Sequence, residues 1–98
     1  MIKLTPAQRQ YLKGLAHPLS PVIIIGEKGL SEAVLKETER ALKAHELIKI
    51  KAGSDEKETR TQWLEQICSE LGAASVQQIG KVLVIYRPAE KPMIQLPR

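Results

Sequence analysis

Two glycines three positions apart, Gly26 and Gly29, are the part of this sequence best suited to binding chemistry. Glycine lets the backbone pass close to a ligand, and a helix predicted to start just after the pair would present unpaired N–H groups and the positive end of its dipole. Glu27 and Lys28 lie between the glycines, so the loop combines a mobile cation with a partly opposing charge. Such a loop can cradle a phosphate, as the GXXG loop of KH domains clamps a sugar-phosphate backbone. A turn that uses glycine only for its geometry is the alternative interpretation.

Basic residues outside this loop could extend the site over a larger polyanion. Lys and Arg total 15 against 11 Asp and Glu, which gives a formal net charge of +4 and a pI near 9.4. Positive charge concentrates in residues 1–30 and 81–98, whereas residues 31–46 and 61–80 carry more acidic than basic side chains. Only a clustered set of cations raises the local potential enough to recruit a polyanion. We therefore predict one positive surface that includes the loop together with Lys49, Lys51, Lys81 and Arg87. A solvated strand face is the alternative explanation for the strand lysines.

Side chains suited to catalysis or metal binding form no recognisable constellation. His17, His45 and Cys68 fall on three different predicted elements, without the spacing of metal ligands. The sequence contains neither a GK[ST] ending nor a G-x-G-x-x-G fingerprint, which disfavours nucleotide-cofactor enzymology. Cys68 shares an apolar helical stripe and is most simply a core thiol. We expect a protein that is not an enzyme and that has no metal, cofactor or small-molecule substrate.

The length and composition bound the architecture that must position these residues. A chain of 98 residues and 10.9 kDa has room for one domain, residues 1–98, which we expect to be a monomer. The sequence has no Phe, one Trp and two Tyr, which excludes a sheet on which several aromatic platforms stack exposed bases. A single cysteine cannot form an internal disulfide and points to a reducing compartment, so we expect a cytoplasmic protein. No run approaches the roughly 20 apolar residues that cross a bilayer.

Three helices are predicted from apolar spacing and from capping residues. The first covers residues 5–16, with Thr5 and Gln8 as a capping box. The second covers 31–45, with Ser31 as its N-cap. The third covers 56–71, with Asp55 and Glu58 as a capping pair and Gly72 as its end. Trp63 in the third helix is expected to be half-buried packing rather than a platform for a base.

Four strands and a tail complete the predicted order. The β-branched run 21–25 is typical of a strand buried on both faces, and 47–51 alternates so that Lys49 and Lys51 oppose Ile48 and Ile50. Strands 74–79 and 82–86 are separated by two residues and predict a tight hairpin. Residues 88–98 are predicted to be an extended, proline-containing tail with little fixed structure. The fold class is therefore α/β, in the order αβαβαββ, with a mixed four-stranded sheet.

Four segments of the sequence carry a resemblance to a known family. Residues 12–19, 21–30, 45–51 and 80–88 together resemble the bacterial YhbY family, the stand-alone form of the CRM domain, named for chloroplast RNA splicing and ribosome maturation. The resemblance implies an RNA-binding domain with a sheet similar to that of the C-terminal domain of translation initiation factor three. It also implies a GxxG loop at the RNA surface, which falls here on Gly26, Glu27, Lys28 and Gly29.

The bacterial family is associated with precursors of the large ribosomal subunit, whereas multi-domain plant relatives act in group II intron splicing. The resemblance thus leads to the hypothesis of a non-catalytic protein that binds ribosomal RNA during assembly of the large (50S) subunit, on pre-50S particles. A protein-interaction module that docks on a ribosomal protein or an assembly factor is the alternative from a different class. An RNA-modifying enzyme without a recognisable site is the third.

Overall fold

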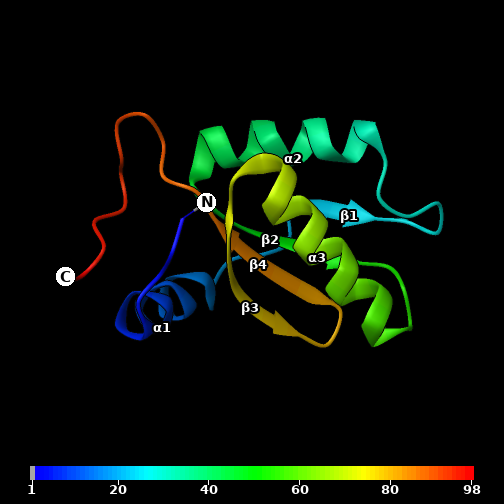
Figure 1. Ribbon diagram of the computed structural model, residues 1–98, viewed down its shortest axis with the longest axis horizontal. Coiled ribbons are helices and arrows are strands. Elements are labelled where there is room, and N and C mark those ends of the chain that lie inside the picture. Colours follow the sequence, from blue (N-terminus) through cyan, green and yellow to red (C-terminus); the bar gives the residue numbers. More distant parts are fainter. Residues whose placement is uncertain (1) are drawn as a thin grey trace.

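The computed structural model describes residues 2–98 and, over that range, folds into three helices and one four-stranded sheet (Figure 1). The elements are α1 (Pro6–Ala16), β1 (Ile23–Ile25), α2 (Glu32–His45), β2 (Leu47–Ala52), α3 (Lys57–Leu71), β3 (Ala74–Ile79) and β4 (Val82–Tyr86). The predicted fold class and element order are confirmed. In Figure 1, α1 and the C-terminal tail lie at the left-hand end, and the connection between β1 and α2 extends at the right.

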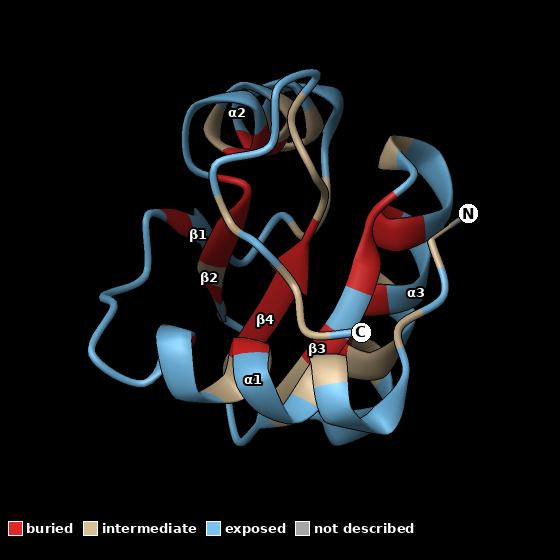
Figure 2. Ribbon diagram, turned by 90° about the vertical axis from the view of Figure 1, so that its left-hand side faces the viewer, coloured by how far each residue is buried: buried red, intermediate tan, exposed pale blue. Residues whose placement is uncertain are grey.

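The sheet has the strand order β1-β2-β4-β3 and separates two apolar cores. β1 pairs parallel with β2, since α2 carries the chain back between them, and the remaining pairs are antiparallel. The larger core lies between one face of the sheet and the helices α2 and α3. The smaller core lies on the other face, where Leu12 and Ala16 of α1 pack against Leu47, Val84 and Tyr86. Figure 2 shows α1 crossing below the strands on this second face.

The first two helices begin where local capping predicts. The backbone N–H of Gln8 donates to the Thr5 hydroxyl over 3.1 Å, and the N–H of Thr5 donates to the Gln8 side chain over 3.0 Å, which completes the capping box. In the same way the N–H of Val34 donates to the hydroxyl of Ser31 over 3.2 Å. Both helix starts are therefore determined by residues within the first turn.

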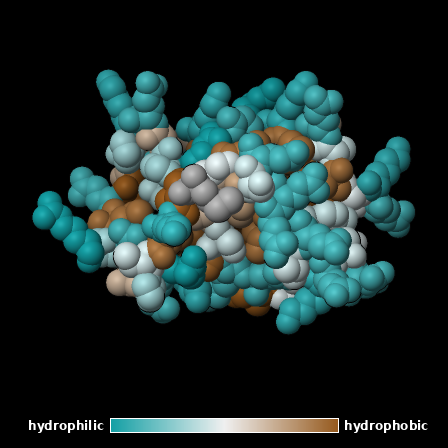
Figure 3. All heavy atoms as spheres, viewed as in Figure 1, coloured by the Kyte–Doolittle hydropathy of each residue, from teal (hydrophilic) through white to brown (hydrophobic). Residues whose placement is uncertain are grey.

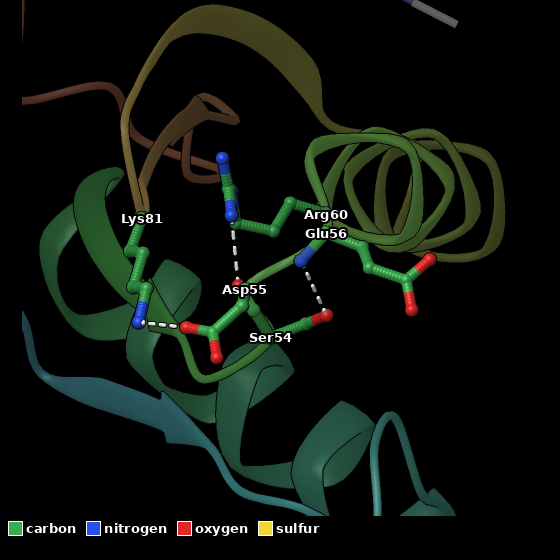
Figure 4. Close-up of polar contacts among 5 residues, drawn as sticks. All are labelled: Ser54, Asp55, Glu56, Arg60 and Lys81. Carbon is green, nitrogen blue, oxygen red and sulfur yellow. Dashed lines mark hydrogen bonds and ion pairs between the residues drawn. The ribbon is translucent and has the colours of Figure 1, made fainter.

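The predicted capping role of Asp55 at the third helix is wrong. The N-cap of α3 is Glu56, which makes no side-chain capping bond. The carboxylate of Asp55 lies 2.6 Å from the ammonium of Lys81 on the β3–β4 turn (Figure 4). Asp55 therefore forms an ion pair with Lys81, a residue distant in the sequence, and does not cap α3 as the local pattern predicts. The C-terminal end of α3 agrees with prediction, because Gly72 adopts the left-handed conformation there.

Strand β1 is not buried on both faces, contrary to the prediction from its β-branched run. Ile23 and Ile25 lie in the larger core, but the side chain of Ile24 is 69% exposed. β1 is an edge strand, and α1 does not reach the part of the sheet face on which Ile24 lies. The composition of a strand indicates that it can be buried, whereas the placement of the helices decides whether it is.

The C-terminal tail forms no helix or strand but has a fixed course, which corrects the prediction of little fixed structure. Glu46, fully buried at the C-terminal end of α2, accepts hydrogen bonds from the backbone N–H groups of Ala89, Met93 and Ile94 at 2.8, 2.8 and 2.9 Å. Ile94 and Leu96 pack against the smaller core. Figure 2 shows the tail passing in front of the sheet. One buried carboxylate thus holds the tail to the domain.

The hydrogen bonds of the Glu46 carboxylate should contribute to the stability of the fold in a way that depends on pH. Burial alone would raise the pKa of Glu46, but its three backbone N–H donors together hold the pKa below its ordinary value. Because the pKa of Glu46 is lower in the folded protein than in the unfolded chain, its ionised carboxylate stabilises the fold fully above the unfolded-state pKa of about 4.3. This stabilisation is lost as the pH falls through the folded-state pKa. We expect Glu46→Gln to lower the free energy of unfolding at pH 7 by about 1–3 kcal/mol. Urea unfolding from pH 7 to pH 3 measures the free energy of unfolding, and the difference between the variant and wild type should become smaller toward low pH.

The control is Glu90→Gln on the exposed part of the tail, which should be as stable as wild type. Equal stability of Glu46→Gln and wild type at pH 7 would contradict the anchoring role.

The close contact between Gly53 and the end of β1 leads to a second prediction about the stability of the fold. Its N–H donates to the carbonyl oxygen of Ile25 over 2.8 Å, and a Cβ at this position would lie 2.4 Å from that oxygen. We expect Gly53→Ala to destabilise the fold by about 1–3 kcal/mol, because the end of β1 and the start of the β2–α3 connection must separate. Thermal or urea unfolding gives the value. Gly14→Ala on α1 is the matched control: a Cβ there meets nothing within 4 Å, so it should stabilise the helix by about 0.5–1 kcal/mol. A Gly53→Ala variant as stable as wild type would show that this close approach is dispensable.

Candidate nucleic-acid interface

The Gly26–Gly29 loop is a tight turn at the end of β1. The N–H of Gly29 donates to the carbonyl oxygen of Gly26 over 3.0 Å, which closes the turn. Gly29 has a φ of 76°, a left-handed conformation that side chains rarely adopt. Glu27 and Lys28, at the tip of the turn, are both exposed. The backbone geometry therefore requires a glycine at position 29 and presents the tip to solvent.

The two glycines of this loop have different surroundings. A Cβ at Gly29 would lie 3.3 Å from Cζ2 of Trp63, so the indole ring on α3 packs directly against the loop. Trp63 also packs on the larger core and is half-buried, which confirms the prediction that it is a packing residue. A Cβ at Gly26 would meet nothing within 4 Å, and Gly26 does not need a left-handed conformation. The Trp63 ring therefore supports the loop at Gly29, whereas the space beside Gly26 contains no protein atom that an added Cβ would meet.

Lys49 and Lys51 lie on the same side of β2, the side that faces α1, as the alternation predicts. Lys51 is exposed and pairs across the sheet with Ile24 on β1 and Val82 on β4. The ammonium of Lys49 donates to the carbonyl oxygen of His17 over 3.2 Å, where it meets the negative end of the α1 dipole. Lys51 is therefore the freer of the two cations, and Lys49 is partly committed to the end of α1.

Lys81 lies at the same end of the sheet as the loop. Its carbonyl oxygen accepts the N–H of Ala52 over 2.7 Å, and its ammonium pairs with Asp55 (Figure 4). The hydrogen bond and the positive charge of Lys81 hold the pKa of the Asp55 carboxyl below its ordinary value. Both side chains are exposed, so the pair is screened by solvent and open to exchange with another anion.

Arg87 does not join the other predicted cations. It follows the opposite end of β4, about 17 Å along the strand from Val82. Its guanidinium donates to the Glu39 carboxylate and to the carbonyl oxygen of Leu71, and its side chain is only 20% exposed. Arg87 ties α2 and α3 to the end of the sheet, so the prediction that it shares a surface with the loop is wrong. A contact between Arg87 and a ligand stays a prediction.

The residues that the fold does bring together define what we call the loop-end surface, namely Gly26, Glu27, Lys28, Gly29, Lys49, Lys51 and Lys81. Two further residues position it and were not recognised from the sequence as parts of a site. Trp63 packs under Gly29, and Gly53 bonds to the end of β1. The sequence signal for Trp63 was its place in the apolar stripe of the third helix, but no local pattern links that stripe to the loop.

Two further observations concern chemistry away from the loop-end surface. Within residues 2–98, no three His, Cys, Asp or Glu side chains lie close enough to hold a metal ion. The single thiol, Cys68, is buried in the larger core, and burial raises its pKa to about 11, so it stays protonated at neutral pH. Over the same range no helix is long and apolar enough to span a bilayer.

Comparison with known proteins identifies the family to which this chain belongs. Residues 4–87 match the CRS1 / YhbY (CRM) domain, so the chain belongs to the CRM domain family. A protein of Haemophilus influenzae named "RNA-binding protein" is 51% identical over 98 residues, which is 100% of this chain and 99% of that one. A Pseudomonas aeruginosa protein named "Probable RNA-binding protein PA4753" is 44% identical over 89 residues, which is 91% of this chain and 86% of that one.

A solved structure gives the same answer for the fold. The solution structure of SAV1595 from Staphylococcus aureus has a TM-score of 0.85 and 33% sequence identity, and the match covers 97% of this chain and 100% of that one. The family resemblance that the sequence carries is thereby confirmed, together with the mixed four-stranded sheet and its three helices.

Proposed function

We propose that this protein is a non-catalytic RNA-binding protein that engages large-subunit ribosomal RNA during 50S assembly through the loop-end surface. The observation that carries the proposal is the exposed glycine turn, open at Gly26 and supported by Trp63, at the start of a capped helix. The names of the similar proteins support RNA as the partner. The association of the bacterial YhbY family with precursors of the large subunit supports ribosomal RNA as the particular RNA.

The loop would act on the sugar-phosphate backbone. With no Cβ at Gly26, a phosphate oxygen can approach the backbone closely, in the connection that leads to the positive end of the α2 dipole. Lys28 adds a positive charge at the tip of the loop, and the neighbouring Glu27 carries a negative charge that repels an anion. Because the two charges oppose each other, binding of a phosphate must also depend on the backbone geometry of the loop. Lys51, which is exposed and has no ion-pair partner among residues 2–98, supplies a second cation on β2, the strand that pairs with β1. Contacts of this kind position RNA and carry no base information.

A protein-interaction module that docks through its mixed-charge helices is less well supported. Figure 3 shows the face that includes α3, and hydrophilic residues cover most of it while hydrophobic residues gather in small separate groups. Stable protein interfaces have a largely apolar centre depleted of charged residues. An enzyme would need an acid, a base or a nucleophile with a supporting partner. The thiol of Cys68 is buried with a raised pKa, and within residues 2–98 no three His, Cys, Asp or Glu side chains could hold a metal ion, so neither feature supports an enzyme.

Gly26→Ala tests the loop directly. We expect roughly tenfold weaker binding of a large-subunit ribosomal RNA transcript, because the added methyl group blocks the approach of a phosphate to the backbone. Unfolding should be unchanged, since the methyl group meets no protein atom within 4 Å. Fluorescence anisotropy gives the affinity and urea unfolding gives the stability. Gly29→Ala is the comparison: its left-handed backbone and the Trp63 ring make a loss of stability the expected result there. Wild-type affinity in folded Gly26→Ala would remove the loop from the RNA site.

Lys51→Gln tests the contribution of the strand. We expect the slope of log K against log salt to fall by about 0.7–0.9, the counterion-release value for one lost phosphate contact. Lys49→Gln should change the slope less, because its ammonium already bonds to the end of α1. Lys43→Gln, an exposed lysine in the last turn of α2 near Arg87, is the charge-matched control and should leave the slope unchanged. If the Lys51 and Lys43 variants have the same slope, β2 is not part of the site.

A further inference from the structure

We propose that the half of the sheet that α1 leaves uncovered binds unpaired nucleobases, so that the RNA recognised by this protein is single-stranded where it crosses the sheet. This inference rests on the proposed RNA binding and adds to it the class of RNA. The uncovered area, which we call the open half-sheet, consists of Ile24, Lys51, Val82 and Ile79, with Val22, Lys49 and Gln77 beside them.

The strand register places these residues in two rows across the sheet. Ile24 pairs with Lys51, Lys51 with Val82, and Val82 with Ile79, so the first row crosses all four strands. Four strands span about 14 Å between the outer two. The second row consists of Val22, Lys49, Val84 and Gln77. Because α1 packs over Leu47, Val84 and Tyr86, the smaller core reaches only Val82 of the first row, which is half-buried at the edge of that core, and Ile24, Lys51 and Ile79 stay exposed.

The open half-sheet exposes apolar side chains that the fold does not use. Ile24 is 69% exposed, Ile79 58% and Val22 53%. Where this area meets α1 there is a groove of about 500 Å³, with an apolar floor of Ile79, Val82 and Val84. Its other lining side chains include Gln10, Lys13, Lys49 and Gln77. The surface therefore alternates flat aliphatic groups with cations and carboxamides.

This mixture fits a polyanion with apolar faces better than it fits a protein. Within the described chain, the side chains that line the groove or form the open half-sheet include lysines and no Asp or Glu. The apolar centre of a protein interface is depleted of lysine, whereas here Lys51 lies between Ile24 and Val82. RNA offers both required partners, a phosphate for each lysine and a base face for each aliphatic group. The carboxamides of Gln10 and Gln77 can each donate and accept, as the edges of bases require.

Only unpaired RNA can use such a surface. In a duplex the base faces are stacked inside the helix, and proteins reach phosphates, 2′-hydroxyls and groove edges instead. A single strand can turn its bases onto a sheet while its backbone stays outside. Ile24 precedes Gly26 by two residues, about 7 Å of strand, so one RNA strand could place a phosphate at the loop and the neighbouring base on the open half-sheet.

The test separates base contact from phosphate contact. The variant is Ile24→Thr/Ile79→Thr, which keeps β-branched residues at two exposed strand positions and changes no charge. The probes are a short single-stranded RNA of mixed sequence and the duplex formed with its complement, titrated by fluorescence anisotropy over a range of salt. We expect wild type to prefer the single strand. The variant should bind that strand roughly three- to tenfold more weakly, with the same salt slope, because apolar contacts and no phosphate contacts are lost.

A matched control is Met93→Gln, which removes an equally exposed apolar side chain from the tail and should leave RNA affinity unchanged. Equal affinity of wild type for the single strand and the duplex, or wild-type affinity in the double variant, would overturn this inference. The proposed function would survive that result if Gly26→Ala still weakened binding. If wild type binds neither probe nor the ribosomal transcript, both proposals fail, and the apolar residues of the open half-sheet would then have to be explained by a protein partner.

Discussion

The short parallel pairing of β1 with β2 is the contact on which the whole proposed RNA interface depends. Three residue pairs, Ile23 with Ile50, Ile24 with Lys51 and Ile25 with Ala52, align the end of β1 with the end of β2. The N–H of Gly53 closes the alignment on the carbonyl oxygen of Ile25, where no side chain would fit. Because the C-terminal ends of both strands lie at the same end of the sheet, the glycine loop, the strand lysines and the open half-sheet meet there. A shift of β1 by one residue in this register would turn Ile24 into the larger core and Ile23 and Ile25 out of it, and would move the loop relative to Lys51.

The opposite end of the sheet has a structural task. There Arg87 bonds to Glu39 of α2 and to the end of α3, while Glu46 holds the tail across the smaller core. Tyr86 lies in the same region, and its burial, together with the negative charge of Glu46, raises its pKa above the ordinary value. Buried charges at this end are matched by hydrogen bonds and stabilise the domain. At the loop end Lys28, Lys51 and Lys81 are exposed and Lys49 is half-buried, and Lys28, Lys49 and Lys51 have no ion-pair partner in the described chain.

The placement of α1 connects the fold to the kind of RNA that we propose the protein recognises. The helix covers enough of the second sheet face to bury Leu12, Ala16 and the tyrosine of β4, but it leaves most of the row that contains Lys51 exposed. Full coverage would have left a domain able to contact RNA only through its loop. Partial coverage adds an apolar and basic surface directly beside that loop. In the proposed complex the aliphatic side chains of this surface would offer base faces a weaker contact than aromatic platforms, so affinity would depend more on the phosphate contacts.

The sequence by itself determined the features that depend on neighbouring residues. The Thr5–Gln8 capping box, the Ser31 cap, the left-handed Gly72 and the hairpin at Gly80 each follow from interactions within a few positions. The pattern of glycines likewise marked the loop, and the wider resemblance indicated the family. Tertiary structure decided everything that depends on residues distant in the chain. Asp55 pairs with Lys81 instead of capping α3, and Arg87 lies far from the loop because β4 runs antiparallel to β2. Ile24 is exposed because α1 ends before it, and Glu46 is buried because the tail returns over it. These outcomes follow from which surfaces meet after folding, and no local pattern contains that information.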